Sequence, residues 1–369
     1  MNITTRSYLY EDQPHIFLKI EGNSDVIKST CNREVILIID ISGSMKDIID
    51  TVRLSIESFE NVIDKEIQDI RQANNDEQKN IPITLIIFND KAEILERGID
   101  KIKPKGRTNI SKAIDLAFDI KSENKMTWII LFSDGCPNIG ITTEEGFRNL
   151  VSMKPKRTKI ICAGFEQYSP SNILAILGDF KFIQNEKDID PFFKSVAFEI
   201  ITATHVNFSS ECIPHEEVLL PDVIFTGSTF SYVFKYKYRK IILKYTNLED
   251  NEIIEETIES KSVEIDDEIK DTMITQKVQH ILLQMKNSHT ILSKQKFLEY
   301  RKKMMNNMLK MNNRTAMIKV QTAFDLIYNK NNHEYESMLT IEKTQSQGNY
   351  LQSDFVNNNS LPPRYKSHS

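Results

Sequence analysis

The chain has 369 residues, a length that allows two or three domains with a sizeable hydrophobic core. Hydrophobic residues make up 40% of it and charged residues 27%, which excludes collagen-like, mucin-like and wholly disordered proteins. The formal net charge is −5 at pH 7, so no global basic excess indicates binding to nucleic acid or to an anionic membrane.

The four cysteines are widely spaced, and none belongs to a C-x-x-C pair. This spacing argues against a zinc ribbon, a RING finger and a redox dithiol. The N-terminal segment acquires Glu11 and Asp12 before any long apolar run, and no later stretch approaches the ~18 apolar residues of a membrane span. We therefore expect an intracellular, cytoplasmic protein with reduced thiols and no membrane insertion.

The first segment, residues 1–32, contains one predicted strand at 15–21. Its alternate residues Ile16, Leu18 and Ile20 are apolar, which is typical of a half-buried strand. Because it precedes the α/β pattern described next, we expect this strand to join a β-sandwich formed further along the chain.

Residues 33–204 alternate short apolar runs with amphipathic stretches, which predicts an α/β domain with a doubly wound, mostly parallel sheet. Strands are predicted at 35–39, 83–88, 128–132 and 158–163, and helices at 48–70, 110–120, 143–153 and 191–201. Open sheets of this kind bind ligands at the carboxyl ends of their strands. The residues that follow each apolar run are therefore the candidates for chemistry.

Oxygen-bearing side chains follow three of these runs. Asp40, Ser42 and Ser44 come after the first strand, Thr108 lies in a later loop, and Asp134 follows the strand at 128–132. A hard cation such as Mg²⁺ or Mn²⁺ prefers about six oxygen ligands, of which the first three residues supply half. A glycine stands in each of the three segments, although the chain has only 11: Gly43, Gly106 and Gly135.

The pattern Asp40-x-Ser42-x-Ser44, then Thr108, then Asp134-Gly135 resembles the von Willebrand factor A (vWA) domain with its metal-ion-dependent adhesion site. The resemblance spans about residues 33–204 and implies a Rossmann-like fold. It implies that Ser42, Ser44 and Thr108 bind the metal directly and that Asp40 and Asp134 bind it directly or through water. A carboxylate of a protein partner would fill the open position, so the expected function is metal-bridged binding without catalytic turnover.

Other interpretations of the Asp40 motif account for less. A helix N-cap cluster would explain Asp40, Ser42 and Ser44 but not Thr108 and Asp134. A phosphotransferase with Asp40 as nucleophile would want a second acid two residues on, where Ser42 stands. A serine hydrolase would need a G-x-S-x-G motif and a histidine near these motifs, and the sequence has no such arrangement. A phosphate-loop ATPase would need the motif G-x-x-x-x-G-K-[ST], which is also absent from the sequence.

Three basic residues beside Thr108, namely Lys103, Lys105 and Arg107, predict a positive rim around the site. Such a rim would favour acidic partners. The alternative is a solvated loop whose charges serve solubility.

Residues 205–268 change to a period of two, which predicts antiparallel strands of a small β-sandwich. Aromatic residues occupy every second position from Phe230 to Tyr238, with lysines between several of them. These residues fit a stacking platform for single-stranded nucleic acid, but a half-buried strand with lysines on its wet side explains them better. We therefore expect no nucleic-acid partner.

Residues 269–330 return to helical spacing, and residues 331–369 have the composition of a disordered tail. The order of vWA domain, sandwich and helical tail resembles, in outline, some intracellular members of the vWA family. Without a RING finger, ubiquitin ligase activity is not expected. The alternative function is a regulatory subunit of an AAA-type ATPase or chelatase assembly, which would use the same metal site to contact a motor.

Overall fold

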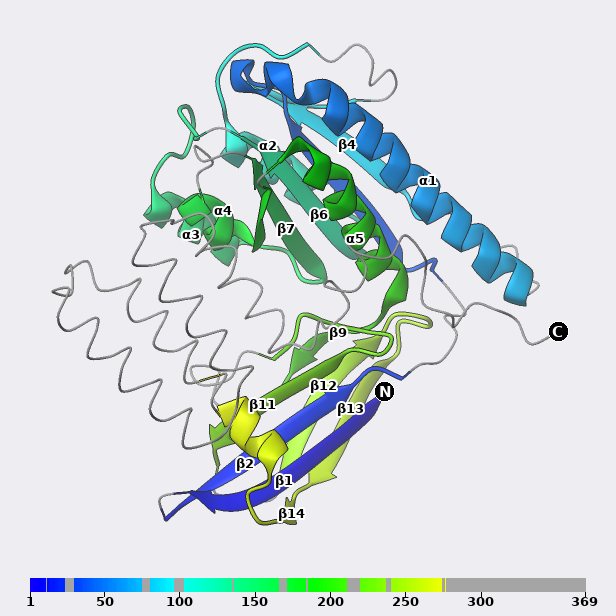
Figure 1. Ribbon diagram of the computed structural model, residues 1–369, viewed down its shortest axis with the longest axis vertical. Helices are drawn as coiled ribbons and strands as arrows, with labels where there is room; N and C mark the ends of the chain where they lie inside the picture. Colours follow the sequence, from blue (N-terminus) through cyan, green and yellow to red (C-terminus); the bar gives the residue numbers. More distant parts are fainter. Residues whose placement is uncertain are drawn as a thin grey trace, which may run out of the picture.

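The computed structural model describes residues 1–10, 12–23, 30–74, 80–95, 103–134, 136–165, 171–183, 185–210, 220–236, 240–273 and 276. The predicted tail at 331–369, most of the predicted helical region at 269–330, and Cys212 lie outside these residues. The described chain forms two units, which are a six-stranded sheet with helices and a pair of four-stranded sheets (Figure 1).

The six-stranded sheet has the order β5-β4-β3-β6-β7-β8, and every neighbouring pair is parallel except β4 and β5. Three central strands are buried at every position: β3 (Arg33–Asp40), β6 (Met126–Ser133) and β7 (Thr158–Phe165). The remaining strands are β4 (Ile83–Phe88), β5 (Ala92–Ile94) and β8 (Asp179–Ile183). The predicted mixed α/β fold with a mostly parallel sheet is confirmed.

Helices cover both faces of this sheet because successive side chains of a strand point to opposite sides. In β3, Val35, Leu37 and Ile39 belong to one hydrophobic cluster, whereas Ile36 and Ile38 belong to another. The first cluster contains residues of α1 (Ile49–Asn74) and α5 (Ile189–Thr202), and the second those of α2 (Ile110–Ile120), α3 (Glu144–Ser152) and α4 (Ser171–Leu177).

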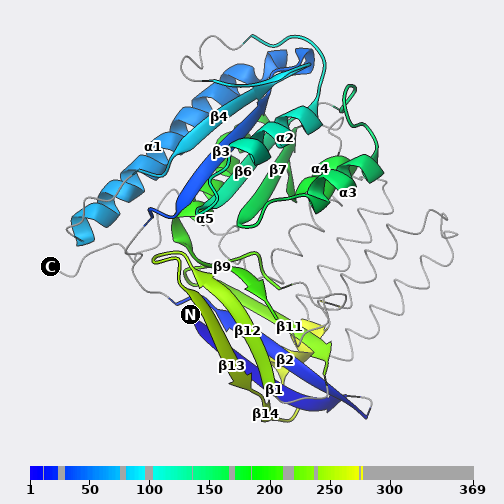
Figure 2. The same cartoon turned by 180° about the vertical axis from the view of Figure 1, so that it is seen from behind.

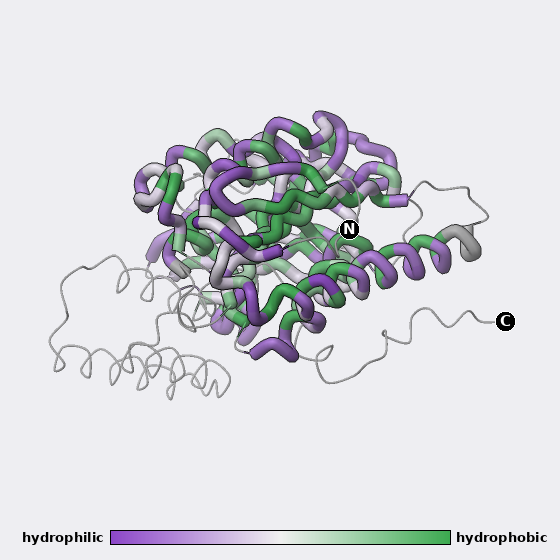
Figure 3. Tube along the Cα trace, turned by 90° about the horizontal axis from the view of Figure 1, so that it is seen from above, coloured by the Kyte–Doolittle hydropathy of each residue, from purple (hydrophilic) through white to green (hydrophobic). Residues whose placement is uncertain are grey.

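Figures 1 and 2 show these helical layers from opposite sides, and Figure 3 shows hydrophobic residues gathered in the interior of the molecule. In the described part of the chain, no helix is both long enough and apolar enough to cross a membrane.

The second unit consists of two four-stranded sheets, ordered β11-β2-β1-β14 and β10-β9-β12-β13. Side chains of both sheets meet in one hydrophobic cluster, which includes Ile16, Phe230 and Phe234 from the first sheet and Ile241 and Tyr245 from the second. These aromatic residues of β11 and β12 therefore act as core side chains. The strands are β1 (Asn2–Tyr10), β2 (Gln13–Glu21), β9 (Ala203–Ser209), β10 (Val223–Phe225), β11 (Thr229–Lys235), β12 (Lys240–Asn247), β13 (Ile253–Glu259) and β14 (Lys261–Ser262).

The sequence pattern does not predict β1, β5, β8 or α4. β1 pairs with β2 along its whole length, from Asn2 opposite Glu21 to Tyr10 opposite Gln13. Its sequence, NITTRSYLY, places polar residues on both faces, so hydrophobic alternation does not reveal the strand. β5 and β8 are short edge strands with several exposed or half-buried residues, which weakens the same signal.

The two units are joined by buried contacts. Arg33 at the start of β3 is fully buried, and its guanidinium donates a hydrogen bond to the carbonyl of Ala203. The Asn32 side chain donates to the carbonyl of Leu248, at 2.9 Å from Nδ2 to oxygen. Within the second unit, a Cβ atom at Gly22 would lie 1.8 Å from the carbonyl oxygen of Phe225, so the close approach of the segment after β2 to β10 requires glycine.

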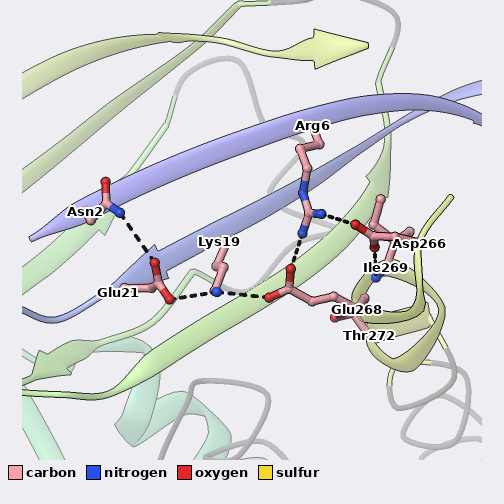
Figure 4. Close-up of polar contacts among 8 residues, drawn as sticks. All are labelled: Asn2, Arg6, Lys19, Glu21, Asp266, Glu268, Ile269 and Thr272. Atoms are coloured by element: carbon pink, nitrogen blue, oxygen red, sulfur yellow. Dashed lines mark hydrogen bonds and ion pairs between the residues drawn. The ribbon is translucent and has the colours of Figure 1, made fainter. Parts of the chain in front are cut away.

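A short helix at 267–273 packs on the outer face of β1 and β2. Its residue Ile269 is fully buried in a small cluster with Tyr8 and Phe17. Around this cluster, Arg6 forms ion pairs with Asp266 and Glu268, and Lys19 Nζ lies 3.0 Å from Glu268 Oε1 (Figure 4). These contacts tie the N-terminal strands to a helix far along the chain, since Arg6 and Asp266 are 260 residues apart in sequence.

Candidate metal site at the carboxyl ends of the parallel strands

The candidate site lies where β3 and β6 end beside each other. The strands run parallel with Ile39 opposite Phe132, so their last residues, Asp40 and Ser133, reach the same edge of the sheet. The loops that follow them carry Ser42, Ser44 and Asp134. Two of the three predicted site segments, the one from Asp40 to Ser44 and the one with Asp134, are thus neighbours because parallel strands end at the same edge of the sheet.

Asp40 is the innermost acid of the site and is fully buried. Its Oδ1 accepts a hydrogen bond from the Ser42 backbone N–H at 2.7 Å, and its Oδ2 accepts one from Ser133 Oγ at 2.6 Å. Both carboxylate oxygens are therefore oriented by neighbouring groups. Ser133 was not predicted as a site residue.

The electrostatic environment of Asp40 is unfavourable for its charge. Burial raises the pKa of its carboxyl to about 7, and the nearby Asp134 adds to the increase. The hydrogen bonds from Ser133 and Ser42 oppose the increase without cancelling it. A cation at this position would supply the missing positive charge.

The serine hydroxyls continue from Asp40 toward Asp134. Ser42 Oγ and Ser44 Oγ lie 3.0 Å apart, and Ser44 Oγ donates a 2.8 Å hydrogen bond to Asp134 Oδ1. Ser42 occupies the N-cap of the 3-10 helix η1 (Gly43–Asp47), yet its side chain makes no capping hydrogen bond. The N-cap interpretation of the motif therefore does not account for the orientation of Ser42.

The loop of Thr108 lies against the same segment. The backbone N–H of Gly43 donates to the Gly106 carbonyl at 3.3 Å, and the N–H of Lys105 donates to the Ile41 carbonyl at 2.8 Å. Thr108 itself is 3% exposed. The structure thus connects Asp40, Ser42, Ser44 and Asp134 through hydrogen bonds and places Thr108 on the adjoining loop.

The donor set fits a hard divalent cation. Within the described residues, no group of three or more His, Cys, Asp and Glu side chains has the arrangement of a metal site. A cation here would instead be held by hydroxyl and carboxylate oxygens of Asp40, Ser42, Ser44, Thr108 and Asp134. Two carboxylates among mainly hydroxyl ligands suit Mg²⁺ or Mn²⁺ better than a soft metal.

The predicted basic rim is partly neutralised. Lys103, Lys105 and Arg107 are all exposed, but Arg107 Nε lies 2.9 Å from Asp90 Oδ1. The hydrogen bonds from Arg107 hold the pKa of Asp90 below its ordinary value. Asp90 was not predicted as a site residue, although it lies only two residues after the end of β4.

Asn138 also lies at the site without having been predicted there. It lies in the loop after Asp134, and its Oδ1 accepts a 3.0 Å hydrogen bond from the Thr108 backbone N–H. Its own backbone N–H donates to the Thr108 carbonyl at 3.1 Å. Only its position four residues after Asp134 marks it in the sequence, because an isolated asparagine carries no motif.

Comparison with known proteins shows the fold. No protein-family model and no curated protein matches the sequence. Among solved structures, the ArnB paralog VWA2 from Sulfolobus acidocaldarius is 16% identical, with a TM-score of 0.59 over 94% of this chain and 97% of that one. A von Willebrand factor type A protein from Catenulispora acidiphila is 10% identical, with a TM-score of 0.55 over 87% and 88%.

The human COPII-coat protein Sec24c also matches, at 10% identity and a TM-score of 0.51 over 89% of this chain and 59% of that one. The first two structures extend the similarity over almost the full length of both chains, beyond the six-stranded sheet. At these identities the likeness shows a vWA fold and no more.

Proposed function

We propose that this protein is a binding module that holds Mg²⁺ or Mn²⁺ and uses it to capture an acidic side chain of a protein partner. The observation that carries the proposal is the hydrogen-bonded series from Ser42 through Ser44 to Asp134, beside a buried Asp40 whose charge is not balanced. Asp40, Ser42, Ser44, Thr108 and Asp134 are the proposed ligands. The cation would supply a positive centre for the partner's carboxylate.

The residues of the chain divide this task. Asp40 would provide negative charge from the buried side of the site, while the serine and threonine hydroxyls would bind the cation without adding charge. The five proposed side chains fill at most five of the roughly six coordination positions that Mg²⁺ prefers, which leaves a position for a carboxylate from outside. The exposed lysines of the rim, Lys103 and Lys105, would attract the same kind of partner.

We also propose that the site has no catalytic turnover. The histidines in the described part of the chain are His15 in β2 and His205 in β9, both in the two-sheet unit. The Ser44 hydroxyl donates to a carboxylate that is itself a proposed ligand.

We propose further that the protein is intracellular and cytoplasmic. The widely spaced cysteines support this proposal, since Cys31, Cys136 and Cys162 form no disulfide among the described residues.

The direct test is affinity capture from a lysate with Mg²⁺ or with EDTA, followed by binding measurements with the purified partner. Asp134→Ala should lose capture in Mg²⁺ as completely as the wild type does in EDTA. Asp119→Ala, which removes an exposed acid of α2, is the matched control and should behave as the wild type. Equal capture by Asp134→Ala and wild type, with and without metal, would refute the proposal.

The same capture experiment distinguishes the binding module from the alternative function. A partner that carries a phosphate-loop ATPase domain would favour the regulatory subunit of an AAA-type assembly, which would contact its motor through this site. A partner without such a domain favours the binding module.

A further inference from the structure

The loop that carries Thr108 is held from two sides. On one side, Asn138 forms two hydrogen bonds with the main chain of Thr108, one through its side chain at 3.0 Å and one through its backbone N–H at 3.1 Å. This pairing resembles a single rung of an antiparallel ladder. It joins the loop after Asp134 to the loop of Thr108.

On the other side, the loop after β4 holds the same segment. The backbone N–H of Asn109 donates to the Asn89 carbonyl at 2.9 Å. Asp90 accepts from both the backbone and the side chain of Arg107, at 3.3 and 2.9 Å. Gly106 adopts a φ of +83°, and a Cβ there would lie 2.5 Å from Asp90 Oδ2.

These two contacts differ in what they do for the site. Asp90 fixes Arg107, which is exposed, whereas Asn138 fixes Thr108, which is buried and is itself a proposed ligand. The Asn138 side chain supplies the acceptor for the Thr108 N–H. Without it, that N–H would lose its partner, and one of the two hydrogen bonds that tie Thr108 to the loop after Asp134 would be gone.

We infer that Asn138 is a positioning residue that sets the affinity of the site by holding Thr108 in place for the cation. This inference rests on the proposed function, because Thr108 is a proposed ligand. Residues that orient metal ligands typically contribute a factor of about 10 to 100 in metal affinity. Asn138→Ala should therefore weaken Mn²⁺ binding at least tenfold while the protein stays folded.

The chemistry of the contact provides a conservative variant. The side chain acts only as an acceptor toward Thr108, so Asn138→Asp keeps the acceptor oxygen and should restore most of the affinity. To control for the added charge, the same substitution is made in a Thr108→Ala background, where it should restore nothing. Asn149→Ala, at an exposed position of α3, is the matched control for loss of an asparagine.

The experiment is calorimetric titration of the full chain with Mn²⁺, combined with a double-mutant cycle. If Asn138 acts through Thr108, Asn138→Ala should cause little further loss in the Thr108→Ala background. Full additivity of the two losses, or wild-type affinity in Asn138→Ala, overturns the inference.

A second readout needs no metal. In EDTA, the Thr108 amide should exchange its hydrogen slowly in the wild type and in Asn138→Asp, and faster in Asn138→Ala. Fast exchange of this amide in the wild type also overturns the inference, even if Asn138→Ala does not fold. Failure of the proposed function looks different, because then the wild type itself binds no Mn²⁺ and Asp40→Asn changes nothing.

Discussion

At the residue scale, the buried charge of Asp40 lowers the stability of the fold but favours binding of a cation. Its carboxylate is fully buried, and burial together with Asp134 raises its pKa to about 7. Without a cation, the raised pKa therefore costs folding free energy that grows as the pH rises above the unfolded pKa of about 3.9 and is fully present above about pH 7. The proposed cation turns the same charge into a favourable contact.

Asp40→Asn should consequently separate stability from binding. In EDTA at pH 8 we expect this variant to be more stable than the wild type by on the order of 1 to 2 kcal/mol, because it removes a buried charge and keeps the shape. In Mn²⁺ it should show no calorimetric binding. Urea unfolding in both conditions checks the prediction, and lower stability of the variant in EDTA would contradict it.

The rim residues lead to a kinetic prediction. Charge reversal by Lys103→Glu with Lys105→Glu should slow association with an acidic partner about threefold or more and leave dissociation nearly unchanged. Arg107→Gln should have a smaller effect, because Asp90 already balances its charge. Stopped-flow or surface-based kinetics at two salt concentrations measures this. Identical association rates for all three proteins at low salt would show that the rim does not steer the partner.

At the scale of elements, the helix at 267–273 depends on the ion pairs shown in Figure 4. Burial alone would raise the pKa of Glu268, but the hydrogen bonds from Lys19 and Arg6 outweigh it, so the pKa lies below its ordinary value. An acid with a lowered pKa contributes stability above the unfolded pKa of about 4.3, and this contribution disappears as the pH falls through the folded pKa. Asp266 also caps this helix by accepting from the Ile269 N–H at 2.9 Å.

Glu268→Gln should therefore destabilise the packing of this helix at pH 7 by about 0.5 to 1 kcal/mol, since the side chain is 44% exposed and solvent screens its ion pairs. The difference from the wild type should shrink as the pH falls through the lowered pKa of Glu268, because the side chain is then protonated in the folded protein as well. Unfolding by urea at pH 7 and at a series of lower pH values measures the effect. Glu264→Gln, at an exposed position of the preceding segment, serves as the control and should match the wild type.

At the scale of the whole molecule, the junction between the two units predicts a single unfolding transition. The hydrophobic cluster of α1 and α5 includes Val206, Val223 and Phe225, which belong to strands of the two-sheet unit. Metal binding in one unit should then stabilise both, by about 2.7 kcal/mol when the metal exceeds its dissociation constant a hundredfold. Thermal melts followed separately by tryptophan fluorescence, which reports Trp128 in β6, and by far-ultraviolet circular dichroism should coincide and shift together with Mn²⁺.

Gly22→Ala tests this coupling from within the two-sheet unit, because its Cβ would meet the carbonyl oxygen of Phe225 at 1.8 Å and so displace a residue of the shared cluster. We expect this variant to lose at least about 2 kcal/mol or to unfold in two steps. A variant as stable and as cooperative as the wild type would mean that the junction does not couple the units.

The sequence by itself determined the elements whose signal is local. The buried runs at β3, β6 and β7 identify themselves because a strand covered on both faces must be apolar throughout. Asp40, Ser42 and Ser44 lie within five residues and so form a visible motif. Since parallel strands end at one edge of a sheet, the sequence also indicated that Asp134 belongs near them.

Only the tertiary structure decided the contacts between distant segments. The pairing of β1 with β2, the packing of Ile269 on Phe17 and the hold of Asn138 on Thr108 join residues whose types are unremarkable where they stand. Such contacts depend on backbone groups and on the distance between loops, and neither leaves a periodic pattern in the sequence. The same reason explains why Asp90 was missed, since its pairing with Arg107 exists only once β4 and the Thr108 loop lie side by side.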